Sequence, residues 1–338
     1  MRVIQDIKLD FSDVLIQPKN TSLNSRSEVD LQREFKFLNT CQIWKGIPLI
    51  ASNMDTVGTP EMYHSLKNHG MLTCFHKFLD DYPENDRNKY IVSIGIREED
   101  FNKLSDLYTR SPEKCNLVCV DVANGYMDSL VVFCQRVREL IPHCILIAGN
   151  VVTGERTKEL ILNGKVDIVK VGIGNGSVCT TRIQTGIGMP QLSAIIECSE
   201  AAHSVGGYII CDGGITCPGD AGKALCAGSD FVMMGSMLAG HEESGGEIIK
   251  EGDKLYKIFY GMSSKEAMDK HYGGVNGYRS SEGKCVKLEY KGPVINTIKN
   301  LLGGIRSTCT YLNAKKIEEL PNNAVFYRVN NQINTIYN

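Results

Sequence analysis

The sequence predicts a closed (β/α)8 barrel, and three observations lead to that prediction. Eight short apolar runs recur along the chain, helical stretches separate several of them, and each run ends in glycine or in a polar residue. Continuous apolar strands that alternate with helices indicate a parallel sheet buried on both faces. Eight such units favour closure into a barrel, whose active site is built from the loops after the strands. An open, doubly wound sheet is the alternative, since closure is not visible in a sequence.

The predicted strands occupy residues 47–54, 72–75, 90–94, 117–120, 144–148, 166–171, 208–210 and 231–234, with helical patterns at 129–140, 155–163, 190–203 and 218–227. The whole chain, residues 1–338, is expected to be one domain. Residues 1–48 form an N-terminal extension over the barrel in this interpretation. Residues 237–293 are glycine-rich and polar, and we expect them to form a flap at the active site. A closing helix at 294–302 is expected to end at Gly303-Gly304, followed by a mobile tail at 330–338.

Composition argues against several classes of protein. The net charge is −2 without a basic block, so we expect no nucleic-acid partner, and no apolar run is long enough to cross a membrane. The 13 cysteines include no Cys-x-x-Cys pair, and many of them sit in apolar runs. The first residues do not resemble a signal peptide. We therefore expect reduced thiols in a cytoplasmic protein.

The strongest chemical signal is the loop after residues 166–171. It carries glycines at alternating positions, then a cysteine, hydroxyl residues and an arginine: Gly172, Gly174, Gly176, Ser177, Cys179, Thr180, Thr181 and Arg182. Glycine tolerates positive φ, so this backbone can turn sharply and approach a ligand. A thiol beside backbone N–H groups and hydroxyls suits a nucleophile that acts on a phosphorylated substrate. An incidental cysteine in a glycine-rich turn is the alternative.

Two further turns follow the seventh and eighth predicted strands, where barrels of this class commonly bind phosphate. They are Asp212-Gly213-Gly214 and Gly235-Ser236. Backbone N–H groups and a hydroxyl can hold a dianion there. Because a carboxylate repels phosphate, Asp212 is expected to accept hydrogen bonds from ribose hydroxyls instead. Taken alone, Asp-Gly-Gly is better explained as a simple turn.

Acid–base candidates lie near the cysteine in sequence and in the predicted flap. Thr181 is two residues from Cys179, and Glu282 belongs to the flap. A thiolate that attacks a ring carbon needs a nearby acid to protonate the departing group, and a hydroxyl backed by a carboxylate can supply it. Taken alone, Glu282 is better explained as a solvated surface carboxylate. Lys77, which follows the second strand, is either a phosphate contact or an ordinary surface lysine.

Eight ordered segments of the chain resemble the IMP dehydrogenase and GMP reductase family, from about residue 8 to residue 329. They are residues 51–58, 121–126, 148–154, 172–186, 212–214, 260–264, 281–284 and 302–311. Two positions depart from the family pattern. Asn175 stands where the family commonly has proline, and Ser236 stands where many reductases have glycine and dehydrogenases tend to have serine.

Three features favour the reductase branch of this family. Only residues 76–90 lie where dehydrogenases usually insert two regulatory CBS modules. Residues 283–293 contain no arginine, whereas dehydrogenases carry an Arg-Tyr pair on the flap that activates water. Residues 177–182 and 306–311 are similar to the reductase versions. The alternatives are a dehydrogenase without CBS modules and a non-catalytic nucleotide-binding barrel.

The resemblance implies an oxidoreductase of purine salvage that converts GMP to IMP and ammonia with NADPH. Cys179 would attack C2 of the guanine ring to form a thioimidate, and Thr181 with Glu282 would protonate the departing ammonia. The positions matched to nucleotide binding are Ser177, Asp212, Gly213, Gly214, Gly235, Ser236, Gly261, Met262, Ser263, Arg279, Ser280, Ser281 and Gly283.

The family resemblance also implies positions that bind the cofactor and an ion. Those matched to NADPH are Ser25, Arg26, Lys77, Asp121, Val122, Ala123, Ile173, Gly174, Met262, Tyr278, Ser307, Thr308, Cys309 and Thr310. The resemblance implies that some of them reach a neighbouring subunit of a homotetramer. It also implies a K⁺ site at the carbonyls of Gly174, Gly176 and Cys179, with Arg182 beside them.

Overall fold

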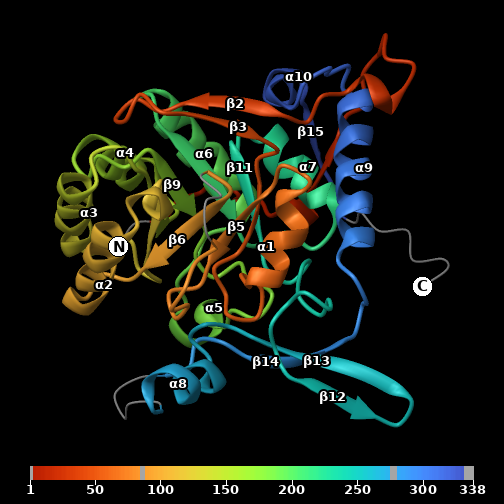
Figure 1. Cartoon of the computed structure of the whole chain (residues 1–338). Coiled ribbons are helices and arrows are strands. Elements are labelled where there is room, and N and C mark those ends of the chain that lie inside the picture. Colours follow the sequence, from red (N-terminus) through yellow and green to blue (C-terminus); the bar gives the residue numbers. More distant parts are fainter. Residues whose placement is uncertain (1–2, 84–87, 275–279, 331–338) are drawn as a thin grey trace.

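The computed structural model describes residues 3–83, 88–274 and 280–330 (Figure 1). Its centre is a closed parallel barrel with strand order β10-β11-β4-β5-β6-β7-β8-β9. The strands are β4 Leu49–Ala51, β5 Leu72–Phe75, β6 Tyr90–Ile94, β7 Leu117–Asp121, β8 Ile145–Val151, β9 Ile168–Val171, β10 Tyr208–Asp212 and β11 Phe231–Met234. The predicted barrel is therefore confirmed, and the open-sheet alternative is excluded.

Helices cover the outside of the barrel. They are α1 Pro60–Lys67, α2 Glu98–Arg110, α3 Asp128–Leu140, α4 Gly154–Leu162, α6 Gln191–His203 and α7 Pro218–Cys226. Short elements fill the connections: η1 Phe11–Asp13, η2 Arg26–Glu28, η3 Pro112–Cys115, α5 Thr181–Thr185, η4 Ile317–Glu319, α10 Leu320–Asn323 and the strand pair β1 Val14–Ile16 with β15 Phe326–Arg328. The helices at 129–140, 155–163, 190–203 and 218–227 are confirmed within a few residues.

Strand residues alternate between two hydrophobic clusters. Ile50, Ile91 and Ile147 belong to the cluster inside the barrel, whereas Leu49 and Val118 belong to the larger cluster that packs under the helices. Both faces of each strand are therefore buried, which is why these segments read as continuous apolar runs.

The N-terminal extension closes one end of the barrel. Strands β2 Arg33–Lys36 and β3 Ile43–Gly46 form an antiparallel hairpin whose Phe35, Phe37 and Trp44 belong to the interior cluster. The Phe35 ring stacks on Phe231 of β11, with 4.3 Å between ring centroids. The expectation that this extension covers the barrel is confirmed.

The predicted flap contains more regular structure than its composition suggested. Strands β12 Ile248–Glu251, β13 Lys254–Tyr260 and β14 Cys285–Glu289 form an antiparallel sheet, and helix α8 Lys265–Tyr272 lies between β13 and β14 in sequence. Figure 1 shows this sheet and α8 at the same end of the barrel as α5, away from the β2–β3 hairpin. The flap therefore adjoins the end of the barrel that carries the cysteine loop.

The closing helix is present, but its predicted end at Gly303-Gly304 was wrong. Helix α9 runs from Ile295 to Tyr311 and passes through Gly303-Gly304 without ending there. A side chain on Gly304 would meet the Pro218 Cβ atom at 2.5 Å, so this glycine allows α9 to pack closely against α7. Ile305 and Cys309 are fully buried and continue the apolar face of α9. Gly304 thus serves packing, and the glycine pair does not terminate the helix.

All 13 cysteines are free thiols, as expected. Among the described residues, no helix is both long and apolar enough to span a membrane. Residues 331–338, most of the predicted tail, lie outside the described part of the chain.

Candidate active site

A thiol, a hydroxyl and a carboxylate stand in line at the mouth of the barrel. The Cys179 thiol donates to Thr181 Oγ1 at 3.2 Å, and the Thr181 hydroxyl donates to Glu282 Oε2 at 2.7 Å. Cys179 is partly exposed, and Thr181 is the first residue of α5. The structure therefore brings together the three residues that were predicted from the sequence as the nucleophile and the acid–base pair.

Backbone pairing sets the position of Glu282. Its N–H donates to the Ser263 carbonyl, and its own carbonyl accepts from the Thr180 N–H at 2.8 Å. The neighbouring Gly283 forms bridges to Cys179 on one side and to Ser264 on the other. Residues 282–284 thus lie as an extended segment between the cysteine loop and the turn at residues 261–264.

Two glycines make this close packing feasible. A side chain on Gly261 would meet the Val178 carbonyl oxygen at 3.0 Å and the Gly283 Cα atom at 3.2 Å. A side chain on Gly283 would meet the Ser264 nitrogen at 2.8 Å. Because neither glycine carries a Cβ atom, the turn and the flap segment can approach the cysteine loop within backbone distance.

A buried lysine links the predicted substrate and cofactor carboxylates. Lys170, in β9, places its ammonium 2.5 Å from Asp121 Oδ1 and 3.0 Å from Asp212 Oδ2. Burial alone would lower the pKa of Lys170, but the two carboxylates outweigh burial and hold that pKa well above its usual value. Burial likewise opposes ionisation of Asp121, yet Lys170 keeps the pKa of Asp121 below its usual value. The mouth therefore contains a buried Lys170–Asp121 ion pair, and Asp212 lies beside the same ammonium.

Asn150 and Asn53 complete this polar network. The Asn150 side-chain amide donates to Asp212 Oδ2 and to the Gly172 carbonyl, both at 2.8 Å. Lys170 also donates to Asn53 Oδ1 at 3.3 Å. The sequence argument assigned no role to Lys170, Asn53 or Asn150. The available signal was a lysine in the middle of an apolar strand, because a buried ammonium requires ionised partners.

Asn175, which departs from the family pattern, connects two loops of the site. Its side-chain amide donates to the Asp212 carbonyl at 2.9 Å, and it packs against Gly172 and Gly213. The cysteine loop is therefore tied to the loop after β10 by a hydrogen bond that a proline could not make.

The predicted nucleotide positions surround this centre. Gly213 and Gly214 follow β10, while Gly235 and Ser236 follow β11, so both pairs lie at the carboxyl ends of neighbouring strands. Gly235 adjoins Met54 and Ser52 of the loop after β4. Ser177 is exposed, whereas Met262, Ser263 and Ser281 are partly buried and Ser280 is exposed. Arg279 and Tyr278 lie outside the described residues.

Lys77 lies beside an aromatic group at the edge of the flap. Its ammonium is 5.4 Å from the Phe78 ring centroid and 5.6 Å from that of Tyr272. Asp121, Val122 and Ala123 end β7 and begin the loop after it, and Ile173 and Gly174 belong to the cysteine loop. This first group of predicted cofactor residues comes from the mouth of the barrel and its surroundings.

The other predicted cofactor residues lie away from the mouth of the barrel. Ser25 and Arg26, at the start of η2, and residues 307–310 of α9 come from elements that pack together. In Figure 1 the end of α9 that adjoins η2 and α10 is remote from α5 and α8. Cys309 is fully buried, so only the hydroxyls of Ser307, Thr308 and Thr310 are available to a ligand. Within one chain, this group does not meet Cys179.

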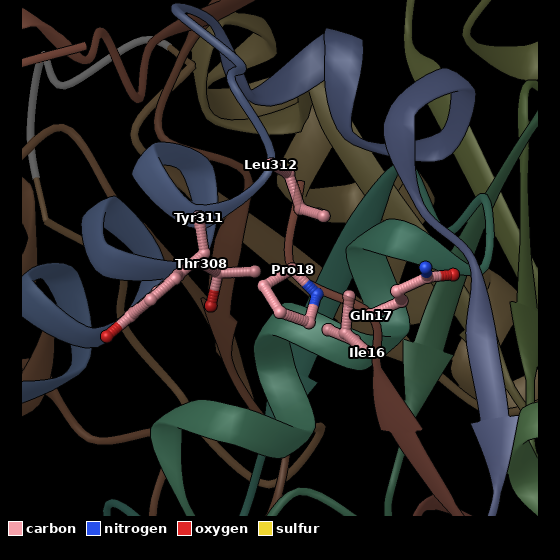
Figure 2. A pocket seen from close by; sticks show the side chains of 6 residues that line it. All are labelled: Ile16, Gln17, Pro18, Thr308, Tyr311 and Leu312. Atoms are coloured by element: carbon pink, nitrogen blue, oxygen red, sulfur yellow. The ribbon is translucent and has the colours of Figure 1, made fainter. Parts of the chain in front are cut away.

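A cavity of about 280 Å³ opens beside this second group (Figure 2). Its lining residues are Ile16, Gln17, Pro18, Thr308, Tyr311 and Leu312. The Lys19 N–H donates to the Tyr311 carbonyl, which holds the N-terminal segment against the end of α9.

The predicted K⁺ ligands lie together in the cysteine loop. Gly174 and Gly176 flank Asn175, and Arg182 packs against Gly174 while donating to the Met189 carbonyl at 2.7 Å. The Gly176 carbonyl accepts the Cys179 N–H at 3.0 Å. Backbone carbonyl oxygens are the ligand type that hard cations prefer, so these residues fit the ion in chemistry.

These observations define a class of protein: a (β/α)8-barrel enzyme whose site is built at the carboxyl ends of the strands. Residues 80–334 match a family model described as the IMP dehydrogenase / GMP reductase domain. The chain is 53% identical over 346 residues to a GMP reductase of Vibrio vulnificus (strain YJ016), covering 100% of this chain and 99% of the relative. It is 52% identical over 347 residues to a GMP reductase of Klebsiella pneumoniae subsp. pneumoniae, with the same coverage. The chain therefore belongs to the IMP dehydrogenase / GMP reductase family and is an oxidoreductase.

Proposed function

We propose that this enzyme reduces GMP with NADPH to give IMP, ammonia and NADP⁺. The observation that carries the proposal is the alignment of Cys179, Thr181 and Glu282 through two hydrogen bonds. A binding protein does not need a nucleophile connected to a proton acceptor, so this alignment favours an enzyme over a non-catalytic barrel. The names of the relatives, GMP reductase in each case, support the same reaction.

The direction of the hydrogen bonds explains how the three groups act. When the Cys179 sulfur bonds to C2 of guanine, its proton passes to the Thr181 hydroxyl, whose own proton passes to Glu282. The reverse transfer then delivers a proton to the departing amino group as the C2–N bond breaks. Ammonia leaves and the purine stays attached to sulfur as a thioimidate. One short relay thus serves as base in the first step and as acid in the second.

The remaining mouth residues hold the nucleotide in this proposal. Backbone N–H groups after β10 and β11 take the phosphate, and Ser236 adds a hydroxyl. Asp212 accepts from the ribose hydroxyls, since its side chain is 21% exposed and its Oδ2 atom lies 3.0 Å from the Lys170 ammonium. The turn at 261–263 and residues 279–283 lie against the base.

NADPH, when bound, would supply a hydride to C2 of the enzyme-bound purine, and the C2–S bond would then break to release IMP and free Cys179. The mouth contains residues suited to hold the cofactor, because Asp121 is ionised, 34% exposed and able to accept from ribose hydroxyls. Lys77 provides a positive charge beside the flap. The second group, Ser25, Arg26, Ser307, Thr308 and Thr310, would serve a cofactor bound to a neighbouring subunit of a homotetramer.

A K⁺ ion at the carbonyls of Gly174, Gly176 and Cys179 would brace the cysteine loop. We also propose a cytoplasmic enzyme of purine salvage, which the free state of all 13 cysteines supports.

The decisive experiment compares the two reactions of the family on purified protein. With GMP and NADPH, we expect loss of NADPH absorbance and release of IMP and ammonia in equal amounts. With IMP and NAD⁺ or NADP⁺, we expect little or no XMP even when K⁺ is present, because residues 283–293 supply no arginine to activate water. XMP formation at a rate that matches GMP reduction would overturn the proposal and identify a dehydrogenase.

A further inference from the structure

Asp55 is a buried carboxylate that joins the barrel to the flap. It lies in the loop between β4 and α1, and its side chain is only 2% exposed. Three donors converge on its Oδ2 atom: Tyr260 Oη at 2.6 Å, His271 Nε2 at 2.7 Å and Lys270 Nζ at 3.0 Å. All three donors belong to the flap, at the end of β13 and in α8.

The electrostatics of this cluster favour the state in which the flap is in contact with the loop after β4. Burial alone would raise the pKa of Asp55, but the hydrogen bonds from Tyr260, His271 and Lys270 hold it below its usual value. Burial, together with the Asp55 carboxylate, raises the pKa of Tyr260, so this phenol remains a donor. A buried carboxylate without donors is strongly unfavourable, so the loop and the flap stabilise each other only when they are in contact.

Packing around the cluster supports the same contact. The His271 ring stacks on Phe78 of the loop after β5, with 3.7 Å between centroids and 3° between planes. At the root of the flap, a side chain on Gly245 would meet the Asp55 carbonyl oxygen at 2.3 Å, so the two backbones touch. The Thr59 hydroxyl donates to the Glu243 carbonyl at 2.5 Å. The flap therefore packs against the loop after β4.

A short series of backbone contacts connects the Asp55–Tyr260 contact to Glu282. Tyr260 immediately precedes the turn at 261–264, and Ser264 caps the first turn of α8. The same turn accepts the Glu282 N–H at the Ser263 carbonyl and pairs with Gly283 through Ser264. Moving Tyr260 or α8 off Asp55 would therefore shift the segment that presents the Glu282 carboxylate to Thr181.

We propose that Asp55 is a positioning residue for the deamination step, which it serves by anchoring Tyr260 and α8 so that Glu282 reaches Thr181. This inference rests on the proposed function, because it assigns Asp55 to one step of that reaction. It predicts a selective defect. Loss of the anchor should slow the release of ammonia, which needs Glu282 as an acid for the departing group, much more than hydride transfer at C2, which expels no amino group.

The test uses Tyr260→Phe, which removes one hydroxyl, and Asp55→Asn, which removes the charge. We expect Tyr260→Phe to slow GMP deamination about 10-fold, the usual effect of one hydrogen bond to a charged group. Deuterium exchange between NADPH and NADP⁺, mediated by IMP, bypasses ammonia and should change less than about 3-fold by the same reasoning. Lys254→Gln is the matched control, because Lys254 forms only an exposed ion pair with Glu289 within the flap. It should behave as the unmodified enzyme.

A double variant separates positioning from general damage. In a Glu282→Gln background, Tyr260→Phe should slow deamination no further, since the group that it positions is already missing. An equal loss in deamination and exchange, or a further 10-fold loss in the double variant, would overturn the inference.

Limited proteolysis of the free enzyme gives a readout that does not depend on the reaction. Cleavage within residues 265–274 should be faster in Tyr260→Phe and Asp55→Asn than in Lys254→Gln. If the unmodified protein does not oxidise NADPH with GMP, the proposed function fails, and the proteolysis still decides the anchor. Unchanged cleavage in both variants would show that Asp55 does not hold the flap.

Discussion

The two ends of the barrel are built from opposite chemistry. The end under the β2–β3 hairpin is closed by aromatic rings, with Phe35 stacked on Phe231 and in edge contact with Tyr208. The end under the flap is closed by charges, with Lys170 between two carboxylates and Asp55 under three donors. Burial of apolar rings stabilises the fold directly, whereas buried charges are tolerated only when each has its partners.

This difference separates stability from function within one barrel. Substitutions at the aromatic end should lower the free energy of unfolding and leave the chemistry of each folded molecule intact. Substitutions of the reacting groups at the charged end, such as Cys179 and Glu282, should lower activity at little cost in stability. Four predictions, from the largest expected effect to the smallest, examine this separation.

The largest effect is expected for Cys179→Ala at the charged end. Removing the nucleophile should lower GMP reduction by more than about 1,000-fold, because the covalent route is lost. GMP should still bind, since its phosphate and ribose contacts lie on other loops, and the melting temperature should stay within a few degrees. Single-turnover NADPH oxidation measures the first quantity, and isothermal titration with GMP measures the second. Residual turnover near one part in a hundred would refute an essential covalent step.

Phe35→Ala should produce the largest change at the aromatic end. Phe35 is fully buried among Phe37, Trp44 and Phe231, so truncation should cost about 3–5 kcal/mol of unfolding free energy. Leu38→Ala is the control in the same hairpin region, because Leu38 is 64% exposed and should change stability by less than about 0.5 kcal/mol. Urea denaturation gives both values. A loss of kcat per folded molecule in Phe35→Ala would break the proposed separation of the two ends.

Glu282→Gln should have an intermediate and selective effect. Glutamine keeps the size of the side chain but cannot accept and return a proton, so deamination should fall about 100-fold. IMP-mediated exchange of deuterium between NADPH and NADP⁺ should fall far less, because it releases no ammonia. Rapid-quench measurement of ammonia beside the exchange assay compares the two. Equal losses would indicate that Glu282 binds the substrate and does not act as an acid.

The contrast between the ends also explains what the sequence could predict. The eight strands were predictable because burial on both faces makes each one a continuous apolar run. The flap sheet was not, because its apolar residues are partly exposed, as Ile248 at 54% and Leu255 at 40% show. Gly303-Gly304 was misinterpreted because close packing against Pro218 and helix termination use the same residue type.

The residues of the candidate site also differ in how far they could be predicted from the sequence. Cys179 and Thr181 are two residues apart, so their proximity could be argued locally. Glu282 is 101 residues from Thr181, and only the pairing of the flap brings them together. Lys170 and Asp55 were missed as functional positions because their partners come from distant strands and from the flap. Buried charges become interpretable only once their partners are known.

The smallest expected effect concerns a charged cluster at the aromatic end. Asp230, just before β11, is 1% exposed; it accepts a hydrogen bond from His203 at 2.8 Å and forms an ion pair with Arg33 at 2.9 Å. The hydrogen bond to Asp230 raises the pKa of His203 above its usual value, while burial and Arg33 oppose the shift. A raised pKa in the folded state means that protonated His203 stabilises the fold.

The sign of the pH dependence follows from that shift. The stabilisation is fully present below the pKa of an unfolded histidine, about 6.5, and is lost as pH rises through the higher folded value. The His203 side chain is 43% exposed, so solvent screens the pair and the effect should stay below about 1 kcal/mol. Between pH 5.5 and pH 8.5, unmodified protein should therefore lose slightly more unfolding free energy than His203→Gln, as measured by urea denaturation.

Both proteins should keep the same pH profile of GMP reduction, because Asp230 lies at the opposite end of the barrel from Cys179. Parallel stability curves would show that the pKa of His203 is the same in the folded and unfolded states. A shifted activity profile would mean that the two ends are coupled.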